Sequence, residues 1–180
     1  MFVYYSLQQV RNRDYKGPDF FVVKGVDGSY SRNKWVAWEE NGRLPNVIVE
    51  LTSPSTLDED LGSKKSLYAA TFRTPEYFCY DPATQQLLGW RLSETKYGRI
   101  KPDQRGWLWS KELDAYIGVY EGAYHNEQGF WLRLFNKAGN LIPNAAENEY
   151  SRAETERQRA EIAEAELTRL RQELAQLKGE

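Results

Sequence analysis

Residues 45–56, PNVIVELTSPST, contain the run of sequence that decides the fold. Its apolar and β-branched residues lie between Pro-Asn and Ser-Pro-Ser, a pattern typical of a short buried strand. Side chains alternate between the two faces of a strand, so Val47 and Val49 share one face. Ile48 and Glu50 share the other. Glu50 therefore points to a face that also carries apolar side chains, where a carboxylate needs a partner.

Other stretches of the first half have the same strand character. They are apolar, β-branched or aromatic runs bounded by turn residues: 1–7 (MFVYYSL), 20–25 (FFVVKG), 76–81 (EYFCYD) and 86–92 (QLLGWRL). A helix is expected over residues 57–73, with the hydroxyls of Ser-Pro-Ser-Thr in position to cap it and acidic residues at its start. Hairpins are expected within residues 106–122 and 129–142. The pattern predicts an α/β fold: a mixed sheet, a flanking helix, C-terminal β-hairpins and a helical tail.

The tail is set apart by its composition, because residues 146–180 contain no Pro and no Trp. Its leucines follow the 3-4-3 spacing of a coiled-coil seam, at Leu167, Leu170, Leu174 and Leu177. We therefore predict a domain over residues 1–145 and a charged helical tail over 146–180. Because the seam is short, three alternatives stay open for the tail: a coiled coil that makes a homo-oligomer, a helix packed on the domain, or a solvated helix.

Composition excludes several classes of function. Lys and Arg number 24 against 26 Asp and Glu, which argues against a uniformly basic nucleic-acid binder. One cysteine excludes an intramolecular disulfide and a multi-cysteine zinc site, and favours a reducing compartment. No apolar run is long enough to span a bilayer and no signal peptide is recognisable, so we expect a cytoplasmic protein with no membrane partner. A local basic patch, or an ordinary solvated rim, is formed by Arg11, Arg13, Lys16, Lys24, Arg32 and Lys34.

Three charged residues flank these strands and suggest chemistry. Asp19 follows Pro18 at the start of one strand, Glu50 ends another, and Lys64 lies on the helix that follows. Two carboxylates at neighbouring strand ends can share Mg²⁺, and a nearby lysine can steady an attacking water or a developing phosphate charge. Taken singly, each residue also has an ordinary interpretation as a turn carboxylate, a surface ion pair or a solvated lysine.

Four stretches in combination are more specific than these residues alone. They are GPDFFVV (17–23), PNVIVELTSPST (45–56), DLGSKKSLY (60–68) and TPEYFCYDP (74–82). Together they resemble the PD-(D/E)XK nuclease superfamily, and more closely the Uma2 family of restriction endonucleases, over about residues 1–145.

The resemblance implies a restriction-endonuclease-like fold and a metal-dependent endonuclease that hydrolyses phosphodiester bonds of DNA. It implies Mg²⁺ as cofactor, with Mn²⁺ as a substitute. Asp19 and Glu50 correspond to the catalytic carboxylates that hold the metal, and the backbone carbonyl of Leu51 to a further ligand.

The catalytic lysine departs from the superfamily pattern. Thr52 stands where the superfamily motif has its lysine, and the Uma2 pattern places the lysine on the following helix. Lys64 matches that position better than the adjacent Lys65, although the two stay alternatives. Asp60, Lys64 and Tyr68 are spaced at four, so they are expected on one face of the helix.

A second departure concerns the start of the sequence. Relatives carry a further N-terminal segment, with a helix and an acidic residue, before the strand that here begins at Met1. The alternative function is therefore a catalytically inactive, nuclease-derived binding or assembly module that oligomerises through its C-terminal helix.

Overall fold

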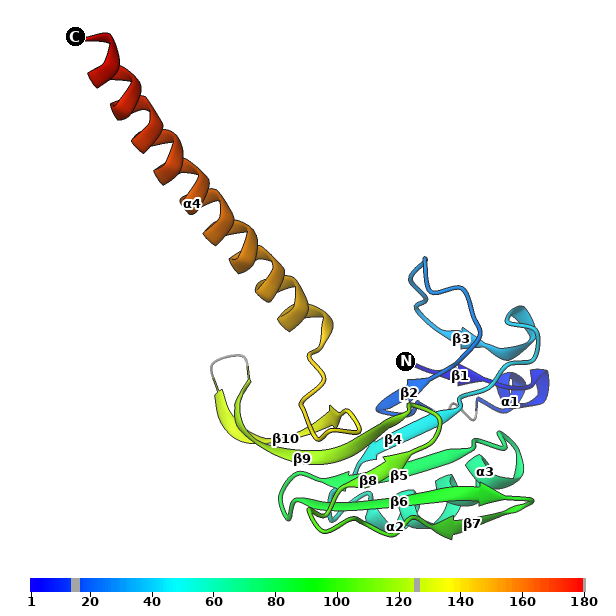
Figure 1. Cartoon of the computed structure of the whole chain (residues 1–180). Coiled ribbons are helices and arrows are strands. Elements are labelled where there is room, and N and C mark those ends of the chain that lie inside the picture. The colour runs from blue at the N-terminus through cyan, green and yellow to red at the C-terminus, as the bar shows by residue number, and fades with distance from the viewer. Residues whose placement is uncertain (14–16, 125–126, 180) are drawn as a thin grey trace. The chain divides into compact units, whose positions relative to one another are not determined.

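The computed structural model describes residues 1–13, 17–124 and 127–179 of the chain. Contacts divide it into two units, residues 1–141 and 142–180, whereas the sequence predicted a division after residue 145 (Figure 1). The single histidine, His125, was expected in a surface loop and lies outside the described residues.

A five-stranded sheet forms the centre of the first unit, with strand order β2-β4-β5-β6-β7. Its strands are β2 (Phe20–Val22), β4 (Val47–Leu51), β5 (Glu76–Asp81), β6 (Gln86–Ser93) and β7 (Lys96–Arg99). β4 and β5 are parallel, and the other neighbours are antiparallel. The predicted mixed sheet is confirmed, with β4, the strand that contains Glu50, lying between β2 and β5.

The connection from β4 to β5 is helical but not one continuous α-helix. It comprises α2 (Leu57–Glu59), a π-helical turn η2 (Asp60–Lys64) and α3 (Lys65–Ala70). The predicted helix over 57–73 is therefore right in place and wrong in detail. It ends at Ala70, and Arg73, beyond its C-cap Thr71, adopts a left-handed conformation with φ of 51°. The expected hydroxyl cap is absent because Thr56 Oγ1 accepts from the Ser53 N–H instead (3.0 Å).

The two faces of the central sheet build separate cores, as the alternation along β4 predicts. Ile48 packs on the helical side with Tyr68, Tyr77 and other aromatic side chains. The opposite face joins the core of the second sheet, through the buried residues Val47, Val49, Phe78, Ile100, Leu108 and Ile117. The domain therefore has three layers, in which the central sheet lies between the helical segment and a second sheet.

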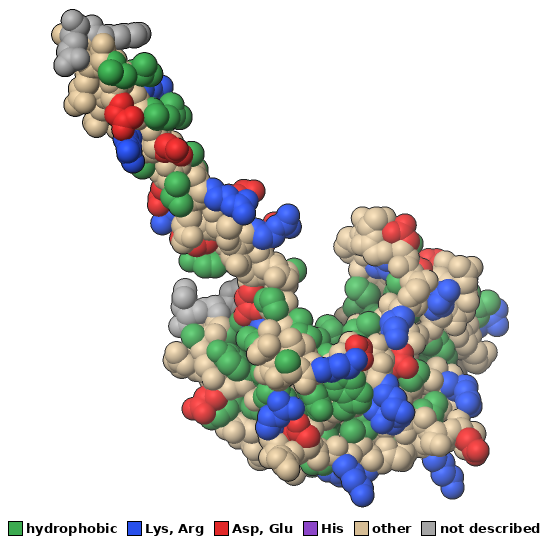
Figure 2. Space-filling model, viewed as in Figure 1, with side chains coloured by type: hydrophobic (Ala, Val, Ile, Leu, Met, Phe, Trp, Pro, Cys, Tyr) green, Lys and Arg blue, Asp and Glu red, His purple; other side chains and the backbone are tan. Residues whose placement is uncertain are grey.

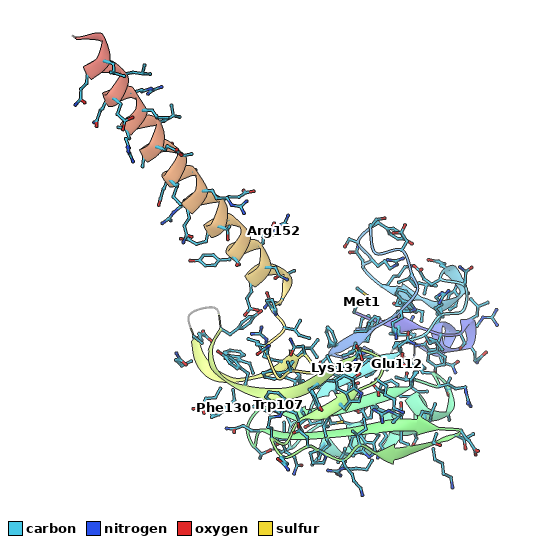
Figure 3. The ribbon with its side chains drawn as sticks, in the orientation of Figure 1. Met1, Trp107, Glu112, Phe130, Lys137 and Arg152 are labelled. Atoms are coloured by element: carbon cyan, nitrogen blue, oxygen red, sulfur yellow. The ribbon has the colours of Figure 1, made fainter. Side chains whose placement is uncertain are left out.

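The second sheet confirms the hairpin predicted within residues 106–122, where β8 pairs with β9, but the hairpin predicted within 129–142 is wrong, because β10 pairs with β9 and only a single bridge joins Phe135 to Leu141. It consists of β8 (Leu108–Ser110), β9 (Ala115–Tyr124) and β10 (Glu127–Phe135), all antiparallel. Glu112, in the turn between β8 and β9 (Figure 3), accepts hydrogen bonds from Lys24 Nζ (3.2 Å) and Asn46 Nδ2 (3.3 Å). This contact fixes the turn to the segments that flank β2 and β4.

The N-terminal prediction was partly wrong. The strand expected over residues 1–7 is only β1 (Val3–Tyr4), which pairs in parallel with β3 (Trp35–Val36), and a short 3-10 turn η1 (Ala37–Glu39) follows β3. Directly after β1 the chain enters α1 (Leu7–Asn12), because Ser6 accepts a hydrogen bond from the Gln9 N–H (3.1 Å) and caps that helix.

The second unit contains one long helix, α4 (Ala145–Lys178). A capping box begins it: Asn144 accepts from the Glu147 N–H (2.9 Å), and Glu147 accepts from the Asn144 N–H (2.8 Å). Within the described residues, no helix combines the length and apolar character needed to cross a bilayer.

Glu76 attaches the second sheet to the start of β5. Its side chain is 1% exposed and is the acceptor for four donors: Arg91 Nε, Ser110 Oγ and the N–H groups of Lys111 and Glu112. Because a buried carboxylate is costly unless every oxygen is satisfied, this set of donors makes Glu76 a structural residue.

We expect Glu76→Gln to lower the free energy of unfolding by about 3 kcal/mol, because the amide N–H₂ would face donors and Arg91 would lose its charge partner. Urea unfolding followed by circular dichroism measures the change. The matched control is Glu121→Gln on β9, where the side chain is exposed. Equal stability of the two variants would contradict an anchoring role for Glu76.

Candidate active site

Asp19 and Glu50 face each other across the two strands β2 and β4. Phe20 pairs with Val49, so the next position of the antiparallel register brings Asp19 opposite Glu50. The Asp19 N–H lies 3.4 Å from Glu50 Oε2, and the Leu51 N–H donates to Asp19 Oδ2 (2.8 Å). The backbone of β4 thus holds the Asp19 carboxylate with a short bond, whereas the contact from the Asp19 N–H to Glu50 is long.

Glu50 is buried, with 1% of its surface exposed. Tyr68 donates its hydroxyl hydrogen to Oε1 (2.7 Å), and Lys64 Nζ lies 3.4 Å from Oε2. Burial raises the pKa of Glu50 above its usual value, and the bond from Tyr68 and the charge of Lys64 only partly oppose it. Burial and the charge of Glu50 also raise the pKa of Tyr68, which keeps that hydroxyl protonated as a donor.

Lys64 contacts two carboxylates of the cluster, those of Glu50 and Asp60. Its Nζ donates to Asp60 Oδ1 (2.8 Å), and Asp60 is itself 1% exposed. Burial alone lowers the pKa of Lys64, but the hydrogen bond to Asp60 and the charge of Glu50 outweigh it and place the pKa above its usual value. Lys64 therefore carries its positive charge at neutral pH.

The π-helical turn separates the two adjacent lysines. Lys64 lies at the carboxylates, whereas Lys65 places its Nζ 3.8 Å from the ring centre of Trp90. Burial lowers the pKa of Lys65. The geometry brings Asp19, Glu50 and Lys64 together and leaves Lys65 outside the cluster.

Sequence reasoning missed Tyr77, which supports the cluster from β5. Its hydroxyl donates to the backbone carbonyl of Asp60 (2.8 Å) and so fixes the π-helical turn. Strand alternation was the available signal, because Tyr77 and Cys79 face the same side of the sheet as Ile48 and pack in the same core.

A hollow of about 370 Å³ borders Asp19. Its walls include Phe20, Phe21, Trp35 and Arg32. Arg32 belongs to the set of basic residues predicted to form a local basic patch or a solvated rim, and its Nε donates to Glu40 (2.6 Å), so the structure gives it a protein partner. Lys24, from the same basic set, likewise bonds to the Glu112 side chain; Lys16 lies outside the described residues.

The cluster has an excess of negative charge, since it contains the carboxylates of Asp19, Glu50 and Asp60 and one ammonium group, that of Lys64, which contacts Glu50 and Asp60. No set of three or more His, Cys, Asp or Glu side chains within residues 1–13, 17–124 and 127–179 is arranged to hold a metal. Mg²⁺, however, is commonly held by one or two carboxylates, with water and phosphate oxygens completing its shell. The opposed carboxylates of Asp19 and Glu50 fit that requirement. In an extended strand the N–H and C=O of one residue point to the same side, so the Leu51 carbonyl also faces the Asp19 side.

A family model described as "Putative restriction endonuclease", Uma2, matches residues 2–119, which is well over half of the chain. The chain belongs to the Uma2 family. The family predicted from the four sequence stretches is therefore confirmed. The mixed sheet, its helical layer and the C-terminal strands are consistent with the restriction-endonuclease-like fold expected for a Uma2 protein. The matched segment contains Asp19, Glu50 and Lys64. No curated protein matches the chain.

The raised pKa of Glu50 predicts a pH-dependent difference between the Uma2 chain and Glu50→Gln. When the pKa of a carboxyl is higher in the folded state than in the unfolded state, the free energy of unfolding falls as pH rises from the unfolded-state pKa through the folded-state pKa. Gln does not titrate. In metal-free buffer, we expect the Tm of Glu50→Gln to exceed that of the wild type by about 2–4 °C at pH 7, and this gain to shrink as pH falls towards 4.

Thermal unfolding by circular dichroism between pH 4 and 8 measures this difference. Glu59→Gln, an exposed carboxylate of α2, is the control and should follow the wild type. A difference in Tm between the wild type and Glu50→Gln that stays constant at all pH values would contradict a raised pKa of Glu50.

Proposed function

We propose that this Uma2 chain is a Mg²⁺-dependent endonuclease that hydrolyses phosphodiester bonds of DNA. The observation that carries the proposal is the arrangement at the β2–β4 strand ends. There Asp19 and Glu50 face each other, and Lys64 Nζ lies 3.4 Å from Glu50 Oε2. The family description supports the reaction class.

Asp19, Glu50 and the Leu51 carbonyl are the groups that would hold Mg²⁺, with Mn²⁺ as a substitute. When bound, the ion would supply Lewis-acid stabilisation of charge on the scissile phosphate. Tyr68 orients Glu50 by binding Oε1, which leaves Oε2 directed toward Asp19 and Lys64. The carboxylates are thus set in place before any ligand arrives.

Lys64 is the proposed catalytic lysine. Its side chain is 20% exposed, and Asp60 restrains it from the buried side. A positioned ammonium group can orient a water molecule for attack or offset the negative charge that develops on the phosphate. Asp60 would act through Lys64, by fixing its position.

Charge explains why DNA binding at this site would depend on the metal. A DNA backbone carries one negative charge per phosphate, and the cluster itself carries more carboxylates than cations. A divalent cation would convert that repulsion into attraction. We therefore expect DNA affinity at the site to rise when Mg²⁺ or Ca²⁺ is present.

We expect titration calorimetry to detect Mn²⁺ and Mg²⁺ binding to the wild type and no binding to Asp19→Asn or Glu50→Gln, because each removes one of two carboxylate ligands.

Cleavage of plasmid DNA in Mg²⁺ should fall about 100-fold or more in Lys64→Ala. Lys65→Ala is the matched control for the lysine and should cleave like the wild type, since Lys65 contacts Trp90.

Two results would contradict the proposal. Metal binding that survives in both carboxylate variants would place the ion elsewhere. A folded wild type that binds no metal and cleaves neither single- nor double-stranded DNA would favour the inactive binding or assembly module instead.

A further inference from the structure

Helix α4 exposes an apolar seam along its C-terminal half. Figure 2 shows hydrophobic side chains there among charged ones, open to solvent. The four seam leucines are half exposed or more: Leu167 51%, Leu170 50%, Leu174 54% and Leu177 73%. Leaving a continuous apolar stripe in water costs about 25 cal/mol for each Å². The stripe therefore indicates a partner surface.

The seam has heptad register, with Leu167 and Leu174 at a positions and Leu170 and Leu177 at d. Ala160 and Ala163 continue the a and d positions toward the N-terminus, as smaller side chains. Glu156 occupies the preceding d position and ends the apolar seam. The interacting segment is thus limited to residues 160–177.

The charges beside the seam match a second copy of the same helix in parallel. In a parallel pair, each g position faces the e position five residues later on the partner helix. Arg159 at g then meets Glu164 at e, and Glu166 at g meets Arg171 at e. Both pairs are attractive, and symmetry forms each of them twice.

The antiparallel arrangements are unfavourable. If the leucine segments overlap in antiparallel fashion, g positions face g positions, and Glu166 meets Glu173. If the helices instead overlap along their whole length, Leu167 lies opposite Glu156 and Leu174 opposite Glu149. Each of those contacts would place a carboxylate against the apolar seam.

We infer that α4 binds α4 of a second copy of this chain as a parallel, in-register, two-stranded coiled coil over residues 160–177. The residues beside the seam form attractive pairs with the same residues of an identical helix, so a second copy of this chain fits the seam. The inference depends on α4 alone and stands whether or not the domain is a nuclease.

Cysteine cross-linking of the full chain tests both association and orientation. A parallel, in-register coil places equivalent d positions within disulfide distance, so Leu170→Cys should form a covalent dimer almost completely under mild oxidation. Ala165→Cys lies at an f position on the outer face and should stay largely uncross-linked. The native Cys79 is buried, and burial raises its pKa to about 12, so it should not react in either variant.

A charge swap tests the register in the reduced protein. Sedimentation equilibrium should show the wild type approaching twice the chain mass of 21.0 kDa as concentration rises. Glu166→Arg should weaken the dimer about tenfold, because it would face Arg171 of the partner copy. Adding Arg171→Glu should restore it.

A monomeric wild type at every concentration would overturn the inference and leave α4 as a solvated helix or one docked on its own domain. Equal cross-linking of Leu170→Cys and Ala165→Cys, or failure of the double swap to restore the dimer, would overturn the parallel register.

Discussion

The buried carboxylate of Glu50 is the constraint on which the arrangement of the domain depends. A carboxylate that is 1% exposed needs partners from the protein, and here three separate segments provide them. Tyr68 comes from α3, Lys64 from the π-helical turn, and the Asp19 N–H from the start of β2. Each segment is therefore positioned by its contact with Glu50, and the same contacts assemble the candidate site. Because burial makes the ionised form of Glu50 costly, this residue lowers the stability of the fold, which is typical of a residue kept for function.

The π-helical turn η2 carries both Asp60 and Lys64, two of the charged residues of the candidate site. An i→i+5 turn inserts one extra residue into the helical path, so the side chains that follow it are rotated relative to those before it. Tyr77 supports this turn by donating to the Asp60 carbonyl (2.8 Å). Within this segment Lys64 bonds to Asp60, whereas Lys65, the next residue, lies over Trp90. Such turns are frequent at functional sites, where they redirect individual side chains.

Sequence reasoning was reliable where a pattern was local and periodic. Alternation along β4 predicted which of its residues share a face and the need of Glu50 for a partner, and the structure agrees with both. Sequence reasoning failed where geometry depends on single hydrogen bonds. Helix α1 has six residues and no apolar periodicity, so its formation depends on capping by Ser6. The π-helical turn depends on a bond from Tyr77, which lies thirteen residues beyond its end. Neither bond leaves a periodic signal in the sequence.

The two buried glutamates, Glu76 and Glu50, differ in how completely their oxygens are hydrogen-bonded. Glu76 and Glu50 are equally buried, at 1% exposure. Four donors surround Glu76, so its oxygens have no capacity to spare for a ligand. At Glu50, Oε1 has a short bond from Tyr68, but the contacts of Oε2 with Asp19 and Lys64 are both 3.4 Å. Contacts that long satisfy a carboxylate oxygen poorly. Burial marks both residues as important, and the incomplete coordination of Oε2, together with the position of Asp19 opposite Glu50 on the neighbouring strand, makes Glu50 the one suited to a cation.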